Sequence, residues 1–133
     1  MKVGAMRAQD IIKQTVSAWD GVTSHAHRFG GTEFRLGKRE LGHIHGDHLV
    51  DLPFPVRVRE ELVRKGEAET HHVLPESGWV SFRIREEADV SRALNLFKKS
   101  YGLALAQRSR REGRAKNVEL KGENDDNQYT NHE

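Results

Sequence analysis

Glycines and prolines divide the first half of the chain into segments that are short enough for strands and too short for most helices. Gly30-Gly31, Gly37-Lys38 and Gly46-Asp47 lie between runs of alternating character, and Pro53-Phe54-Pro55 ends the last run. Short alternating runs between such turn residues are typical of antiparallel strands. The strands that we predict here cover residues 22–29, 32–36 and 39–45, and a fourth follows Gly46-Asp47.

Other segments carry apolar residues at helical spacing. A stripe from Ala8 to Trp19 indicates a first helix, residues 56–65 a second, and residues 90–104, preceded by acidic residues, a third. Residues 68–74 and 79–85 form a second predicted hairpin between the last two helices. We therefore expect an α+β fold, a two-layer sandwich with helices on one face of an antiparallel sheet and the other face partly open.

Length and composition indicate one small domain. The chain has 133 residues, which fits one core, and we expect that domain to cover residues 1–106. From 107 to 133 the chain is first basic and then acidic with little to bury, which is typical of a disordered tail. No apolar run reaches half a membrane span and the first residues offer no signal-peptide core, so we expect a cytoplasmic protein without a membrane partner.

Histidines and acids gather in two short stretches and provide the main chemical signal. Five of the eight histidines lie within residues 40–51 and in His71-His72. Imidazole binds divalent metals and transfers protons near neutral pH. The chain has no cysteine, so any metal must be held by imidazole and carboxylate, and zinc, nickel and iron(II) suit such donors.

The loop length of the first hairpin decides which of these side chains share a face. With a two-residue loop at Gly46-Asp47, His45 lies opposite His48 and His43 lies on the same face. We therefore predict a divalent metal or ligand site formed by His43, His45 and His48. In this register Asp51 falls on the opposite face, which weakens it as a ligand.

Three further residues are candidates to complete that site, namely Asp51, Glu40 and His72. A four-residue loop in the second hairpin would place His72 across from Ser81 on the open face and turn His71 toward the core. The structural alternative is that the histidines hydrogen-bond to backbone or carboxylate groups at the edge of an apolar surface. The sequence leaves both interpretations open.

An enzyme is a second interpretation of the same residues, although no motif specifies a substrate or a reaction. His43 or His45 would act as general base or acid, with Glu40 or Glu33 as its carboxylate partner. Arg28 or Arg83 would anchor an anionic substrate. Ser77 precedes a glycine but lacks the strand-turn-helix elbow of a nucleophile, so we expect it to serve a turn.

Partner binding without catalysis is the third interpretation. Trp79 would anchor a protein or small molecule on the open sheet face, with Arg28, Arg83 and His72 around it, because tryptophan and arginine are frequent at binding hot spots. Trp79 as ordinary core is the simpler alternative. A basic cluster in the tail would bind nucleic acid through phosphates without sequence preference. That cluster consists of Arg108, Arg110, Arg111, Arg114 and Lys116.

Several strings between Trp19 and Tyr101 resemble a family of small proteins labelled luciferase-domain proteins. The strings are Gly30-Gly31-Thr32-Glu33-Phe34, residues 39–46 (RELGHIHG), residues 51–55 (DLPFP), residues 71–75 (HHVLP) and residues 77–81 (SGWVS). This family has no assigned mechanism, and the strings contain no flavin or nucleotide fingerprint. The resemblance therefore implies a family label without a reaction, and the expected layout is also similar to frataxin-type folds, whose open sheet face is a binding surface.

Overall fold

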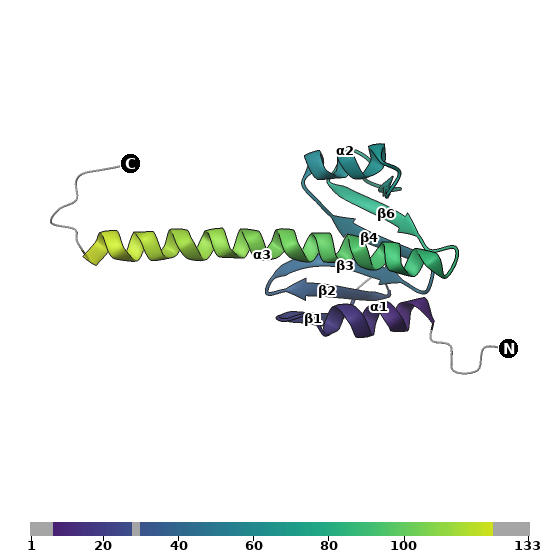
Figure 1. Ribbon diagram of the computed structural model, residues 1–133, viewed down its shortest axis with the longest axis horizontal. Coiled ribbons are helices and arrows are strands. Elements are labelled where there is room, and N and C mark those ends of the chain that lie inside the picture. The colour runs from purple at the N-terminus through teal and green to yellow at the C-terminus, as the bar shows by residue number, and fades with distance from the viewer. Residues whose placement is uncertain (1–6, 28–29, 124–133) are drawn as a thin grey trace. The chain divides into compact units, whose positions relative to one another are not determined.

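The protein is described by a computed structural model that covers residues 7–27 and 30–123. Six strands form one antiparallel sheet in the order β1-β2-β3-β4-β6-β5 (Figure 1). The strands are β1 (Val22–Ala26), β2 (Thr32–Leu36), β3 (Arg39–His45), β4 (Leu49–Pro53), β5 (Glu69–Thr70) and β6 (Trp79–Arg83). The helices are α1 (Ala8–Ser17), α2 (Val56–Arg64) and α3 (Ala88–Glu123). The predicted α+β class and antiparallel sheet are confirmed.

One face of the sheet carries the apolar core. Figure 1 shows α1 and the first turns of α3 over the same side of the strands. Phe34 of β2 meets Phe97 of α3 edge to face, with ring centroids 5.4 Å apart. Both rings are fully buried, and two aromatic rings in this geometry contribute more than their buried area alone. Ile12 and Val16 are the buried residues of α1.

The chain divides into two compact units between Gly102 and Leu103. All six strands belong to the first unit. The helix α3 continues to Glu123, so the segment that we expected to be a tail from residue 107 is helical as far as it is described. Its role as a separate tail stays a prediction. Among the described residues, no helix combines the length and apolar character that crossing a membrane requires.

A β-bulge in β3 controls which side chains reach the open face. Phe34 pairs with Gly42 and Arg35 with Glu40, so Leu41 is an extra residue on β3. A bulge changes the alternation of side chains, and Glu40 thereby faces the same side as His43, three residues later. Gly42 has φ +147°, and a Cβ there would lie 2.9 Å from the Asp51 carbonyl oxygen, so this position requires glycine.

The register of the first hairpin differs from our expectation. His45 pairs with Leu49 and His43 with Asp51, because the turn contains three residues, Gly46 to His48, rather than two. A shift of one residue moves every side chain of a strand to the other face. The prediction that placed Asp51 away from the histidines was therefore wrong: Asp51 lies across from His43 on the open face.

The register of the second hairpin also differs. Glu69 pairs with Ser81, and β5 ends at Thr70, so the connection to β6 is longer than the four residues that we expected. The side chain of His71, rather than that of His72, therefore points to the open face of the sheet. The prediction that His71 turns toward the core was wrong. Gly78 anchors this connection, because a Cβ there would lie 1.7 Å from the Phe54 carbonyl oxygen.

Candidate functional site

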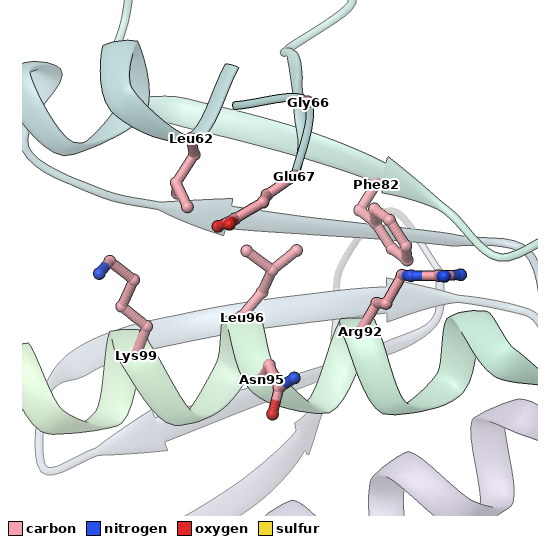
Figure 2. A pocket seen from close by; sticks show the side chains of 8 residues that line it. All are labelled: Leu62, Gly66, Glu67, Phe82, Arg92, Asn95, Leu96 and Lys99. Carbon is pink, nitrogen blue, oxygen red and sulfur yellow. The ribbon is translucent and has the colours of Figure 1, made fainter. Parts of the chain in front are cut away.

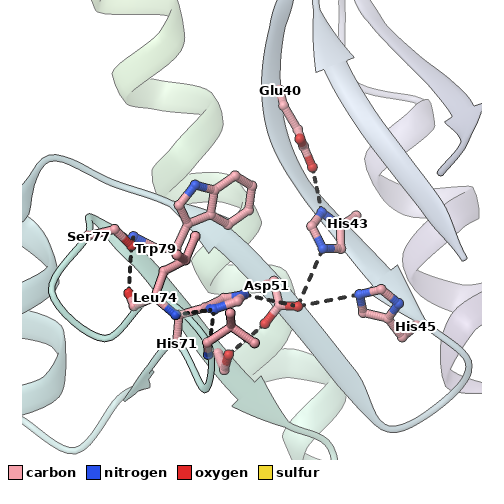
Figure 3. Close-up of polar contacts among 10 residues, drawn as sticks. Glu40, His43, His45, Asp51, His71, Leu74, Ser77 and Trp79 are labelled. Atoms are coloured by element: carbon pink, nitrogen blue, oxygen red, sulfur yellow. Dashed lines mark hydrogen bonds and ion pairs between the residues drawn. The ribbon is translucent and has the colours of Figure 1, made fainter. Parts of the chain in front are cut away.

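Asp51 is the centre of a cluster of imidazoles on the open face of the sheet. Its side-chain oxygen Oδ1 accepts a hydrogen bond from Ser81 Oγ at 2.6 Å. Its other oxygen, Oδ2, lies 3.4 Å from Nε2 of His43, 3.4 Å from Nε2 of His45 and 3.8 Å from Nε2 of His71 (Figure 3). Three imidazoles from two separate segments therefore face one carboxylate oxygen.

Neighbouring strands position these groups. His43 and His45 are two residues apart on β3 and share a face, Asp51 pairs with His43 from β4, and Ser81 pairs with Asp51 from β6. Because Asp51 is 1% exposed, its charge needs compensation from these partners. His43, His45 and Asp51 lie on strands, which hold side chains more firmly than loops do, while His71 lies on the connection after β5.

His43 lies between two carboxylates. Its Nδ1 is 2.6 Å from Glu40 Oε2, and since an ionised carboxylate only accepts hydrogen bonds, the Nδ1 carries a proton. Burial lowers the pKa of His43, but the neighbouring Asp51 and Glu40 outweigh this effect and raise the pKa to about 9. At neutral pH the metal-free ring is therefore protonated on both nitrogens, and a metal that binds Nε2, the nitrogen that faces Asp51, must displace its proton while Nδ1–H stays on Glu40.

His71 has the opposite arrangement. Its Nδ1 accepts hydrogen bonds from the backbone N–H groups of Val73 and Leu74, each at 3.1 Å. The ring proton of neutral His71 therefore lies on Nε2, the nitrogen that faces Asp51. Burial lowers the pKa of His71 more than the Asp51 charge raises it. His71 is thus a hydrogen-bond donor toward the centre of the cluster rather than a lone-pair donor.

The contacts within the cluster also shift the pKa values of His45 and Asp51. Burial and the nearby His43 lower the pKa of His45. Burial would raise the pKa of Asp51, but His43 and the Ser81 hydroxyl outweigh it and the pKa is lowered. At neutral pH the centre is therefore an ionised carboxylate facing a neutral His45.

Within the described part of the chain, three groups of side chains are positioned to hold a metal ion. They are His27 with Glu40 and His43, His43 with His45 and Asp51, and Asp51 with His71 and His72. The first group contains the 2.6 Å contact between His43 and Glu40, which is a hydrogen-bond distance. The third requires His71 Nε2, which carries the ring proton. The group of His43, His45 and Asp51 fits a metal best.

The separations in this group match those between ligands of one ion. Nitrogen and oxygen ligands lie about 2.0–2.1 Å from zinc, so two ligands in a tetrahedral site are about 3.3 Å apart. Asp51 Oδ2 is 3.4 Å from both His43 Nε2 and His45 Nε2. These separations exceed the usual length of a hydrogen bond to a carboxylate, which is about 2.7–2.9 Å.

The structure brings some predicted residues together and separates others. His43, His45 and Glu40 are in the cluster, and the Trp79 ring lies 5.4 Å from that of His43. His48 is exposed in the turn and belongs to none of the three groups, so the predicted set of His43, His45 and His48 is not assembled. His72 is exposed and stacks on His71 with ring centroids 4.5 Å apart.

The remaining candidates lie around the cluster. Arg83 is exposed on β6 and pairs with Leu49, while Arg28 lies outside the described residues. Glu33 forms an ion pair with Arg35. Ser77 Oγ donates to the Leu74 carbonyl oxygen at 2.7 Å, which confirms the predicted role in a turn.

Sequence reasoning missed His71 and His27 as members of the cluster, and it placed Asp51, a candidate ligand, on the wrong face. His27 stacks on His43, with ring centroids 4.2 Å apart. The spacing of His25, in β1, and His27, just after it, offered a signal for His27, since residues two apart share a face. Asp51 and His71 depended on turn lengths, which local sequence specifies weakly.

A pocket of about 330 Å³ lies away from the histidines, between α2, β6 and the start of α3 (Figure 2). Its apolar side chains are Leu62, Phe82 and Leu96. Phe82 alternates with Ser81 on β6 and therefore faces the helix side of the sheet. This pocket is separate from the cluster on the open face.

The fold and the cluster define a class: a small α+β protein with a histidine and aspartate site on the open face of an antiparallel sheet. The family model described as Luciferase domain matches residues 38–100. This match assigns that segment to the luciferase-domain family, and it includes Glu40, His43, His45, Asp51 and His71. No curated protein and no solved structure matches the chain.

Proposed function

We propose that this protein binds one divalent transition metal ion through His43 Nε2, His45 Nε2 and Asp51 Oδ2. The observation that carries the proposal is the 3.4 Å separation of the Asp51 oxygen from each of the two nitrogens. This spacing is too long for strong hydrogen bonds and matches two ligands of a common ion.

The contact between Glu40 and His43 supports the same proposal. Histidine ligands of metals usually donate their second ring N–H to a carboxylate, which fixes the tautomer and makes the other nitrogen a stronger ligand. Glu40 accepts such a bond from His43 Nδ1 at 2.6 Å. Glu40 is therefore a positioning residue, and His43 is the ligand that it orients.

Zinc is the first ion to test, and iron(II) is the second. Two imidazoles and one carboxylate form catalytic zinc sites, and the same donor set holds iron(II) in oxygenases. Three protein ligands leave at least one coordination position open in either case.

The test is isothermal titration of zinc and of iron(II), the latter without oxygen, into untagged protein freed of metal by a chelator. We expect one equivalent of metal to bind, and we expect Asp51→Asn and His45→Gln to weaken binding by about 100-fold. His48→Gln is the matched control, because His48 is in the same hairpin but outside the groups, and it should bind as the wild type does.

Two results would overturn the proposal. One is the absence of stoichiometric binding by the folded wild type, and the other is equal loss of affinity in His48→Gln and His45→Gln. Thermal melting of each metal-free variant shows whether it is folded, so a folding defect is recognised separately. The alternative function would then be the one that the sequence also predicts, a protein-binding surface around Trp79 and Arg83.

A further inference from the structure

His71 carries a hydrogen-bond donor that the cluster itself does not use. Its proton is on Nε2, because Nδ1 accepts the N–H groups of Val73 and Leu74. The distance from Nε2 to Asp51 Oδ2 is 3.8 Å, which is beyond hydrogen-bond length. This N–H therefore faces the proposed metal ligands without a hydrogen bond to Asp51, which leaves it available to an acceptor from another molecule.

The segment after β5 holds His71 in this orientation through several contacts. Arg59 of α2 donates to the Pro75 carbonyl oxygen at 2.5 Å. The Phe54 N–H donates to the Gly78 carbonyl oxygen at 3.0 Å, and the Trp79 N–H donates to Ser77 Oγ. A donor that is fixed before a ligand arrives binds it at a lower entropic cost.

Charge indicates the kind of ligand that would use this donor. Asp51 compensates one of the two positive charges of a divalent ion, while Glu40 lies beyond the His43 ring on its Nδ1 side. An anionic oxygen ligand at the open position would compensate the second charge. A carboxylate suits the site, because one oxygen binds the metal and the other can accept the hydrogen bond from His71.

Apolar side chains adjoin this position. The Trp79 ring is 6.1 Å from the ring of His71 and 5.4 Å from that of His43 (Figure 3). Val73 and Leu74, whose N–H groups hold His71, are 66% and 50% exposed. Exposed apolar side chains next to a polar site are typical of surfaces that bind the apolar part of a ligand.

We propose that the open face binds a small organic monocarboxylate, with its carboxylate on the metal and on His71 Nε2–H and its apolar body against Trp79, Val73 and Leu74. This inference rests on the proposed metal site, since the carboxylate needs the ion. Acetate and benzoate are suitable probes because they share the carboxylate and differ in the apolar body. Imidazole is a third probe, since it binds metals but offers no second acceptor.

The experiment uses the cobalt(II)-loaded protein, whose visible absorption reports both the bound ion and changes in its coordination. We expect acetate and benzoate to change the spectrum saturably, with benzoate at least about fivefold tighter because it buries apolar area. His71→Asn keeps an acceptor for the Val73 and Leu74 N–H groups but removes the donor, and should weaken both carboxylates by about tenfold. Imidazole binding should stay within about twofold of the wild type.

His72→Asn is the matched control, because it makes the same change at the adjacent exposed histidine, and it should bind carboxylates as the wild type does. Trp79→Leu should reduce the preference for benzoate over acetate. Cobalt that binds stoichiometrically without any response to carboxylates would overturn this inference and leave the metal site intact. Equal carboxylate affinity in wild type and His71→Asn would also overturn it, and failure to bind cobalt would overturn both proposals.

Discussion

Successive side chains of β3 and β4 point to opposite faces of the sheet, and the two faces differ in chemistry. On the helix side, Ile44, Val50 and Leu52 are buried among apolar side chains. On the open side, His43 and Asp51 are 8% and 1% exposed, almost as buried as the core. Burial on the first face stabilises the fold through the hydrophobic effect, whereas burial on the second requires charge partners. On the open face, charged groups are therefore buried only where they are paired with one another.

The largest expected effect comes from breaking the helix side. Phe97→Ala removes a fully buried ring that packs on Phe34, and should lower the free energy of unfolding by about 3–5 kcal/mol. Urea denaturation of the metal-free protein measures this loss. Zinc affinity of the folded fraction should be unchanged, and a parallel loss of zinc affinity would show that the two faces are not independent.

Gly42→Ala should affect both faces, because the bulge lies between them. The new Cβ would come within 2.9 Å of the Asp51 carbonyl oxygen and of the Phe97 ring, and we expect about 2–3 kcal/mol of destabilisation together with weaker zinc binding. Gly37→Ala is the control, since it also has a positive φ but nothing within 4 Å. Equal effects of the two changes on zinc binding would contradict the role of the bulge.

Protonation of His43 on the open face should make the free energy of unfolding of the metal-free protein depend on pH. The pKa of His43 is raised from 6.5 to about 9, so its protonation stabilises the folded state below pH 6.5, and this contribution is lost as the pH rises to 9. We expect a decrease of the order of 1–3 kcal/mol in the free energy of unfolding across this range. Urea denaturation at a series of pH values measures it, and His43→Gln should flatten the slope; an unchanged slope would refute the assignment.

The smallest effect that we expect is a loss of zinc affinity on changing Glu40, the hydrogen-bond partner of His43. Glu40→Gln keeps an acceptor for His43 Nδ1–H but removes the charge, and should weaken zinc binding by about tenfold with little change in the melting temperature. Glu33→Gln is the matched control, because Glu33 pairs with His43 across the strands but has its ion pair with Arg35. If both variants weaken zinc equally, the effect is general electrostatics rather than orientation of His43.

The spacing of apolar residues predicted the strands and helices well, but it predicted poorly which side chains share a face of the sheet. The bounds of β2 and β3 agree with the expected segments 32–36 and 39–45, because glycines mark both ends of each run. The cluster depended on a three-residue turn after His45 and a long connection after Thr70. Each difference in loop length moves the side chains that follow it to the other face, and so Asp51 and His71 were placed on the wrong face.

The proposed metal site requires that His43 and His45 bind the ion through Nε2 while His71 keeps a proton on Nε2. Long-range ¹H–¹⁵N correlation spectra of the histidine rings, recorded before and after one equivalent of zinc, test it residue by residue. We expect Nε2 of His43 and His45 to take the shifts of metal-bound nitrogens and His71 to keep its Nε2–H tautomer. Unchanged spectra of His43 and His45, or zinc on His71 Nε2, would contradict the claim.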